Sequence, residues 1–250
     1  MNTNNSNQVQ GFDNFEDCDY NLAWSYSNFN RNLIAANRIA NLKPNAIVLE
    51  LGAGTSPVET LVHKNFKRPD IVFTKVDGDS KYTDKEGIYV FDITSNDFKE
   101  FIAESKYDAV VLMEVIEHID EVDGLDLIDY IYSILVKEGL FILSTPTPPF
   151  YKKYEERVWP TDHDFEYDYD DMYILLNKNF KVEKTIGWSL EEREYTHLLE
   201  ENDFIRTVHA KLRGAFPEGF IKSIISSLSP AVYCRQMTYI CKARRISNNS

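Results

Sequence analysis

Two short segments of this sequence carry carboxylate and imidazole side chains at spacings that suit metal binding or proton transfer. The first contains Glu114, Glu117 and His118. If a helix begins at Glu114, spacings of three and four residues place these side chains on one face, within reach of one metal ion. The second segment, Asp162-His163-Asp164-Phe165-Glu166, lies further along the chain. Alternatively, His118 or His163 is a general base that needs no metal.

A glycine-rich turn carries the strongest ligand-binding signal. Residues 46–51 (AIVLEL) form a nearly continuous apolar run, and Gly52-Ala53-Gly54 follows them, before a helix expected to start at Pro57. Glycines at such a turn let the backbone approach a ligand, because a Cβ would collide with it. The stretch GAGTSP lacks the third glycine of a dinucleotide-binding fingerprint. Glu50, two residues before the first glycine, suits a ligand with a cationic amino-acid portion better than an anionic pyrophosphate.

Strands that alternate with helices must position these residues. Apolar runs typical of strands occupy residues 46–51, 71–76, 88–91, 107–113, 140–144, 181–186 and 236–243. Helical patterns occupy residues 20–42, 57–66, 97–105, 123–136 and 168–178. Such alternation predicts an α/β fold, with a mostly parallel sheet covered on both sides. Asp77 and Asp92 follow the second and third strands and should meet the glycine turn at the carboxyl edge, where ligands bind in such sheets.

The chain is expected to have four parts. These are a disordered tail (residues 1–12) and a helical segment within 1–45, the sheet core over 46–188, a helical insertion over 189–230, and a final strand and tail over 231–250. The insertion is interpreted as two or three helices that form a lid or substrate-recognition cap, or that only cover hydrophobic surface. Tyr151, Tyr154 and Trp159 follow the fifth strand and would stack on a substrate or pack on the core.

Composition narrows the class of protein. The 250 residues include 27 Lys and Arg against 40 Asp and Glu, a net charge of −13. This charge disfavours nucleic acid as a partner, because affinity for phosphate backbones comes mainly from Lys and Arg. The chain has three cysteines without a CxxC motif, a polar N-terminus, and no apolar run near the ~20 residues of a membrane span. We therefore expect a cytoplasmic protein with a small-molecule substrate and no membrane partner.

Together these motifs resemble those of the class I S-adenosylmethionine (SAM) dependent methyltransferases, and in particular the group known as methyltransferase types 11 and 12. Residues 50–54 (ELGAG) are similar to the family's first motif, E/DxGxG, and residues 108–118 to its fourth-strand motif. The resemblance implies a Rossmann-like seven-stranded sheet and SAM as cofactor. It places Asp77, with Asp79 as a rival, on the ribose hydroxyls. The implied cofactor-binding residues are Glu50, Gly52, Ala53, Gly54, Asp77, Asp92 and Ile93 (both against the adenine), and Glu114.

The Glu-x-x-Glu-His segment also resembles a subset of this superfamily, the small-RNA 3′-terminal 2′-O-methyltransferases. That resemblance implies a divalent metal held by Glu114, Glu117, His118 and His163. Carboxylates and imidazoles without thiolates suit Mg²⁺, Mn²⁺ or Fe²⁺ better than structural zinc. The metal would lower the pKa of an acceptor hydroxyl. Similar EVIEH segments occur in metal-free methyltransferases of small molecules, where the acid and the histidine line the pocket or cap the following helix.

We therefore expect methyl transfer from SAM to an oxygen or nitrogen of a small polar acceptor, such as a glycan, a nucleotide-linked sugar or a phosphorylated metabolite. The expected catalytic residues are Glu114, His118 and His163, which remove or orient the acceptor's proton. Three alternatives stay open: a metal-dependent RNA 2′-O-methyltransferase, a nicotinamide-dependent oxidoreductase, and a catalytically silent SAM-binding subunit.

Overall fold

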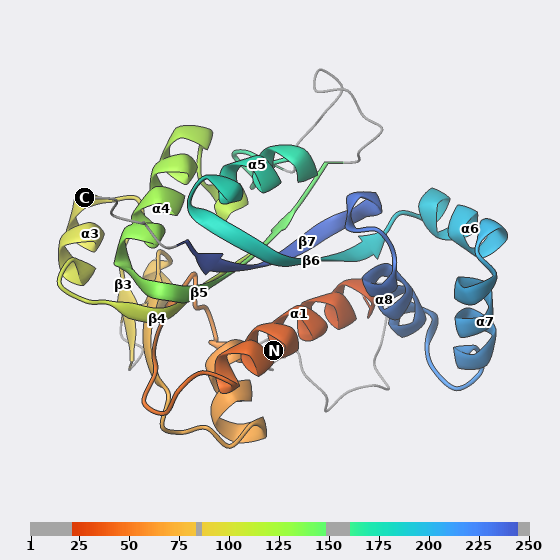
Figure 1. The fold of residues 1–250 in the computed structure, drawn as a ribbon, viewed down its shortest axis with the longest axis horizontal. Helices are drawn as coiled ribbons and strands as arrows, with labels where there is room; N and C mark the ends of the chain where they lie inside the picture. The colour runs from red at the N-terminus through yellow and green to blue at the C-terminus, as the bar shows by residue number, and fades with distance from the viewer. Residues whose placement is uncertain (1–21, 84–86, 149–160, 245–250) are drawn as a thin grey trace, which may run out of the picture.

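A seven-stranded sheet runs through the computed structural model, which describes residues 22–83, 87–148 and 161–244 (Figure 1). The strand order is β3-β2-β1-β4-β5-β7-β6. The strands are β1 (Ile47–Leu51), β2 (Val72–Asp77), β3 (Ile88–Val90), β4 (Tyr107–Met113), β5 (Leu135–Pro146), β6 (Phe180–Leu190) and β7 (Cys234–Ala243). Neighbouring strands are parallel, except that β7 runs antiparallel to both β5 and β6. The predicted α/β fold with a mostly parallel, Rossmann-like sheet is confirmed.

The order of the strands reverses between β1 and β4. From β1 the chain moves outward through β2 to β3, then returns to β4 and continues toward the opposite edge. Residues 48–51 of β1 pair in parallel with residues 109–112 of β4, so that the two strands end side by side. Because ligands of open parallel sheets bind beyond the carboxyl ends at such a reversal, the loops after β1 and β4 should bound the site.

Helices cover both faces of the sheet. On one face lie α3 (Asn96–Ile102), α4 (Glu121–Ile134) and α5 (Tyr169–Asn179), and on the other α1 (Leu22–Ala40) and α8 (Glu218–Leu228) (Figure 1). Alternate residues of β4 divide between the two cores: Val110 and Leu112 pack on the α4 side, Ala109 and Val111 on the α1 side. A strand buried on both faces needs apolar residues at nearly every position, which explains the continuous apolar run in the sequence.

Several elements differ from their expected boundaries. β5 begins at Leu135, directly after α4, because the chain passes from helix to strand without a loop. The helix expected over 57–66 is a short α2 (Pro57–Thr60) followed by a π-helical turn, η1 (Leu61–Asn65). β6 and β7 are longer than expected because they pair with each other as far as Leu190 and Cys234.

No helix begins at Glu114, so the condition for a shared helix face is not met. β4 ends at Met113, and Glu114 adopts a left-handed conformation with a φ of 55°. Its backbone N–H donates to the carbonyl of Ser144 on β5 at 2.8 Å, so this residue still belongs to the edge of the sheet. One 3₁₀ turn, η3 (Ile116–His118), follows, and α4 then begins with Asp120 as its N-cap. Glu114 therefore does not share a helix face with Glu117 and His118.

Three helices lie between β6 and β7: α6 (Glu192–Glu201), α7 (Asp203–Leu212) and α8. α8 packs against α1 and β6, and the Asn30 amide donates to the Ser223 hydroxyl at 3.0 Å. α6 and α7 extend beyond the end of the sheet (Figure 1) and share a separate small core with α8, which buries Tyr195, Ile205 and Ile225. Within the described part of the chain, none of the helices has the length and apolar composition needed to cross a membrane.

Candidate active site

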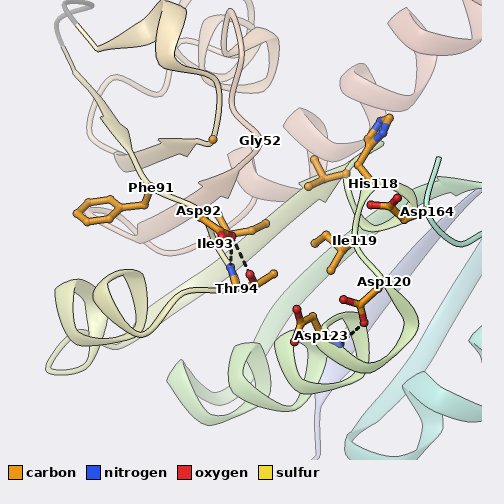
Figure 2. Close-up of a pocket in the computed structure, with 12 residues that line it drawn as sticks. Gly52, Phe91, Asp92, Ile93, Thr94, His118, Ile119, Asp120, Asp123 and Asp164 are labelled. Atoms are coloured by element: carbon orange, nitrogen blue, oxygen red, sulfur yellow. Dashed lines mark hydrogen bonds between the residues drawn. The ribbon is translucent and has the colours of Figure 1, made fainter. Parts of the chain in front are cut away.

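A cleft of about 410 Å³ opens at the carboxyl edge of the sheet (Figure 2). Gly52 after β1, residues 91–94 after β3, and residues of the β4–α4 connection form its walls. Its volume falls in the range of small-molecule sites, roughly 300–1,000 Å³. Four aspartates also line it, at positions 92, 120, 123 and 164. This acidic lining favours a ligand that carries positive charge.

The turn after β1 requires glycine at its first position. Gly52 has a φ of 64°, and a Cβ added to it would lie 2.2 Å from Cγ2 of Val115. Gly54 also has a positive φ, of 50°, but a Cβ there would find only the Tyr82 hydroxyl at 3.6 Å. The loop after β4 therefore presses directly on the first glycine. Val115 is a contact that the glycine pattern alone could not reveal.

Glu50 lies beneath this turn rather than on the wall of the cleft. Its side chain is buried, and its Oε2 accepts a hydrogen bond from the Ser56 hydroxyl at 2.6 Å. Ser56 has a left-handed φ of 52°, which brings its hydroxyl back toward β1. Burial raises the pKa of Glu50 to about 7, although the Ser56 hydrogen bond opposes the shift. Glu50 thus acts on the cleft through the conformation and charge of the turn.

The acids after β2 and β3 also organise backbone turns. Asp77 accepts the N–H of Gly54 at 2.7 Å and that of Asp79 at 2.9 Å, and so joins the ends of β1 and β2. Asp79 instead pairs with Lys81 at 2.5 Å. Asp92 accepts the backbone N–H and the hydroxyl of Thr94 at 2.9 and 2.8 Å, and it lines the cleft (Figure 2). Ile93, the predicted adenine contact, is buried and also lines the cleft.

Glu114 is held by side chains from three other elements. Its Oε2 forms an ion pair with Nη1 of Arg31 on α1 at 3.0 Å and accepts from the Gln236 amide on β7 at 3.2 Å. Its Oε1 accepts from the Ser144 hydroxyl on β5 at 2.8 Å. The Arg31 side chain is fully buried, whereas the Glu114 side chain is 20% exposed. The carboxylate is therefore fixed in place while one side of it stays accessible.

Glu117 and His118, which are adjacent in the sequence, come together with His163, which lies far along the chain. One ligand atom from each lies within 4.8 Å of the others. The carbonyl of Glu117 accepts the N–H groups of Asp164 and Phe165 at 2.8 and 3.2 Å, which fastens the second segment to the 3₁₀ turn. The two imidazole rings meet edge to face with their centroids 5.1 Å apart. Glu114 lies outside this group, although the expected set of four ligands included it.

Hydrogen bonds fix the orientation of both histidines. Nδ1 of His118 lies 2.5 Å from the carbonyl oxygen of Asp162, and Nδ1 of His163 lies 2.7 Å from Oε1 of the buried Glu166. Because both partners are acceptors, each Nδ1 donates the hydrogen bond, and Nε2 is the ring nitrogen left to face a ligand. A histidine that donates through one nitrogen to a carbonyl or carboxylate is arranged as metal-ligating histidines are.

Glu117 completes this group as a buried acid. Burial and the nearby charge of Glu114 raise its pKa above the usual value, and a hydrogen bond from the Thr145 hydroxyl at 3.2 Å opposes the shift. A buried carboxyl with a raised pKa beside two oriented imidazoles is typical of a functional site. The arrangement can hold a cation or move a proton.

The sequence interpretation did not predict Arg31 and Gln236 as partners of Glu114, and it named Glu166 within the second segment without giving it a role. Glu166 could have been found from its spacing of three residues from His163. Arg31 could have been found as a charged residue on the buried stripe of α1, four residues from both Ser27 and Ala35. The tyrosines and tryptophan proposed for substrate stacking, Tyr151, Tyr154 and Trp159, lie outside the described residues, as does the N-terminal tail.

The fold and the cleft define a class I SAM-dependent methyltransferase. The seven-stranded, mostly parallel sheet is the one that the resemblance implies, and Gly52 and Asp92 line the cleft at its carboxyl edge. The model of a family described as "Methyltransferase domain" matches residues 26–208, so the chain belongs to this family. It is accordingly an enzyme that uses SAM as its cofactor, and not a nicotinamide-dependent oxidoreductase.

Solved structures with this fold include several methyltransferases. A SAM dependent methyltransferase from Archaeoglobus fulgidus superposes with a TM-score of 0.56 at 18% identity, over 90% of this chain and 100% of that one. Magnesium protoporphyrin IX methyltransferase from Synechocystis PCC 6803, with bound S-adenosylhomocysteine (SAH), gives 0.51 at 12% identity, over 89% and 86% of the chains. Coclaurine N-methyltransferase, bound to N-methylheliamine and SAH, gives 0.50 at 15% identity, over 86% and 72%. No curated protein sequence matches this chain significantly.

Proposed function

We propose that this enzyme transfers the methyl group of SAM to a hydroxyl oxygen of a small polar acceptor, with a divalent cation held by Glu117, His118 and His163. The observation that carries the proposal is the orientation of the two histidines, whose Nδ1 atoms are both occupied by acceptors. With one carboxylate oxygen, they offer two nitrogen ligands and one oxygen ligand. This set of ligands suits Mn²⁺, Fe²⁺ or Mg²⁺, because it contains imidazole and carboxylate groups and no thiolate. A bound cation of this kind lowers the pKa of an acceptor hydroxyl.

The chain's own residues connect this group to the methyl donor. His118 belongs both to the three-residue group and to the wall of the cleft, and Asp164, next to His163, lines the same cleft (Figure 2). An acceptor hydroxyl beside His118 therefore lies next to the cofactor, which favours an in-line attack on the sulfonium methyl. We propose Glu50, Gly52, Ala53, Gly54, Asp77, Asp92 and Ile93 as the residues that position SAM.

The nature of the acceptor follows from the charges around the cleft. Asp120, Asp123 and Asp164 surround its mouth, and such an acidic rim disfavours a bare anionic group but accepts sugar hydroxyls. We therefore favour a sugar hydroxyl of a glycan or of a nucleotide-linked or phosphorylated metabolite, with any phosphate held outside the rim. The terminal ribose of an RNA offers the same hydroxyl chemistry, but the net charge of −13 opposes it.

Calorimetry tests the proposed cation site. The purified chain is stripped with EDTA and titrated with Mn²⁺, in the presence of SAH. We expect one site per chain, lost in His163→Ala and retained in His197→Ala, a control at an exposed histidine on α6. Loss in both variants, or binding that survives His163→Ala, would contradict the proposal and leave His118 and His163 as candidates for a metal-free general base.

A second experiment tests methyl transfer itself. The Mn²⁺-loaded enzyme is incubated with methyl-labelled SAM and separate pools of glycans, sugar nucleotides and RNA oligonucleotides. Labelled product in a sugar pool, reduced in His118→Ala, is the expected result. SAM binding without turnover in any pool would support the alternative of a catalytically silent SAM-binding subunit.

A further inference from the structure

We infer that Arg31 is a positioning residue that withholds Glu114 from the proposed cation site, so that only Glu117, His118 and His163 hold the cation. This inference rests on the proposed function and deepens it. It departs from the four-ligand set that the sequence resemblance implies. Its consequence is chemical: three protein ligands leave positions free for oxygen atoms of the acceptor.

The first argument is the geometry of Glu114 itself. Both of its carboxylate oxygens are engaged, Oε2 by Arg31 at 3.0 Å and Gln236 at 3.2 Å, and Oε1 by Ser144 at 2.8 Å. The three side chains come from α1, β7 and β5, elements that are fixed by their packing. The carboxylate of Glu114 lies outside the group formed by Glu117, His118 and His163, whose ligand atoms all lie within 4.8 Å of one another. A carboxylate with one ion pair and two charge-assisted hydrogen bonds gives them up if it moves to a cation.

The second argument is the burial of Arg31. Its side chain is fully buried, and a buried guanidinium is costly unless an opposite charge accompanies it. Glu114 supplies that charge. If Glu114 moved to a cation, its ion pair with Arg31 would be broken, and the guanidinium would lie close to a second positive centre. The ion pair and a fourth ligand therefore exclude each other.

The third argument is that the network extends beyond the pair. The Ser189 hydroxyl donates to Oε1 of Gln236 at 3.2 Å, which turns the Gln236 amide nitrogen toward Glu114. The Ser27 hydroxyl lies 3.1 Å from that of Ser189. Ser27 and Arg31 are one helical turn apart on α1, so the same helix supports Glu114 directly and through the amide. Such a connected network resists displacement of its central carboxylate.

A double-mutant cycle with Mn²⁺ titration tests this inference. In an otherwise wild-type chain, Glu114→Gln should change the Mn²⁺ affinity by less than about fivefold. Replacing a residue that only orients a ligand typically lowers metal affinity about 10–100-fold, and replacing a ligand itself lowers it far more. Arg31→Met should tighten Mn²⁺ binding about tenfold or more, because it removes a positive charge and releases a carboxylate. Adding Glu114→Gln to Arg31→Met should abolish that gain, which a merely structural role of Arg31 would not produce.

Controls keep each outcome decisive. Melting temperatures of the metal-free variants show whether they fold, and if Arg31→Met does not, Ser144→Ala removes one donor to Glu114 and should tighten Mn²⁺ binding in the same direction, by less. If the wild type binds Mn²⁺ and Glu114→Gln abolishes binding as His163→Ala does, the inference is wrong while the proposed cation site stands. A folded Arg31→Met with unchanged affinity also overturns it. If the wild type binds no Mn²⁺, the proposed cation site fails, and the inference fails with it.

Discussion

The buried acid Glu50 should make the stability of this enzyme fall as the pH rises through neutrality. Burial raises its pKa from 4.5 to about 7 in the folded protein. The folded state therefore favours the protonated form of Glu50. The contribution of Glu50 to the free energy of unfolding is complete below pH 4.5 and is lost as the pH rises through about 7. Since each tenfold change in an equilibrium constant is worth about 1.4 kcal/mol, the difference corresponds to about 3 kcal/mol in the free energy of unfolding.

Glu50→Gln removes this dependence, because the amide keeps the shape and still accepts the Ser56 hydrogen bond without a charge to bury. The free energy of unfolding is measured by urea denaturation of both proteins, without cofactor, at pH 5, 6, 7 and 8. We expect the stability of the variant relative to the wild type to grow by about 2.5 kcal/mol between pH 5 and pH 8, nearly all of it below about pH 7.5. Other titrating groups, including Glu117, contribute equally to both proteins and cancel in the difference.

Glu183→Gln serves as the control, because Glu183 is exposed on β6 and its replacement should leave the wild-type pH profile intact. Parallel profiles for the wild type and Glu50→Gln would refute the reasoning, since they would mean that Glu50 is ionised in the fold at no cost. A variant that is less stable at every pH would show instead that the charge of Glu50 supports the turn.

Three further predictions test other parts of the structure. Gly52→Ala should abolish SAH binding in calorimetry and lower stability, because the new Cβ meets Val115 at 2.2 Å, whereas Gly54→Ala, with space around it, should cost only the strain of its positive φ, about 1 kcal/mol. Glu166→Gln should weaken Mn²⁺ binding about 10–100-fold and spare SAH binding, because it removes the carboxylate that orients His163. Ile225→Ala should lower the free energy of unfolding by about 2–4 kcal/mol in urea denaturation, because Ile225 is fully buried on the inner side of α8.

The sheet could be predicted from the sequence because its signals are local. A strand buried on both faces reads as a short apolar run, and glycines and aspartates mark the turns that follow, as at Gly52, Asp77 and Asp92. The conformation at Glu114 could not be predicted in this way. The helical spacing of the acids and the histidine suggested a shared face, but the hydrogen bond to Ser144 on β5 keeps Glu114 at the sheet edge. That contact depends on strand pairing, which local periodicity does not encode.

Arg31 illustrates the same limit at longer range. Its position on the buried side of α1 was readable from the pattern, but its partner was not, because Glu114 lies far along the chain. Gln236 is a similar case, since its amide reaches Glu114 only once β7 has paired with β5. Charged and amide groups that are buried must find partners, but only the assembled sheet determines which ones.

The connection after β4 joins the two halves of the proposed chemistry. Val115 presses on Gly52 and so limits the cofactor turn, and two and three residues later the same connection supplies Glu117 and His118. A shift of this connection would therefore change the shape of the cofactor cleft and the position of the acceptor group together. Because methyl transfer needs the sulfonium methyl and the acceptor oxygen at a defined separation, a shared support is an efficient way to keep that separation constant. Glu114 lies at the start of this connection and is fixed by contacts with α1, β5 and β7. We therefore expect Glu114 to keep the cofactor turn and the acceptor group at a constant distance from each other.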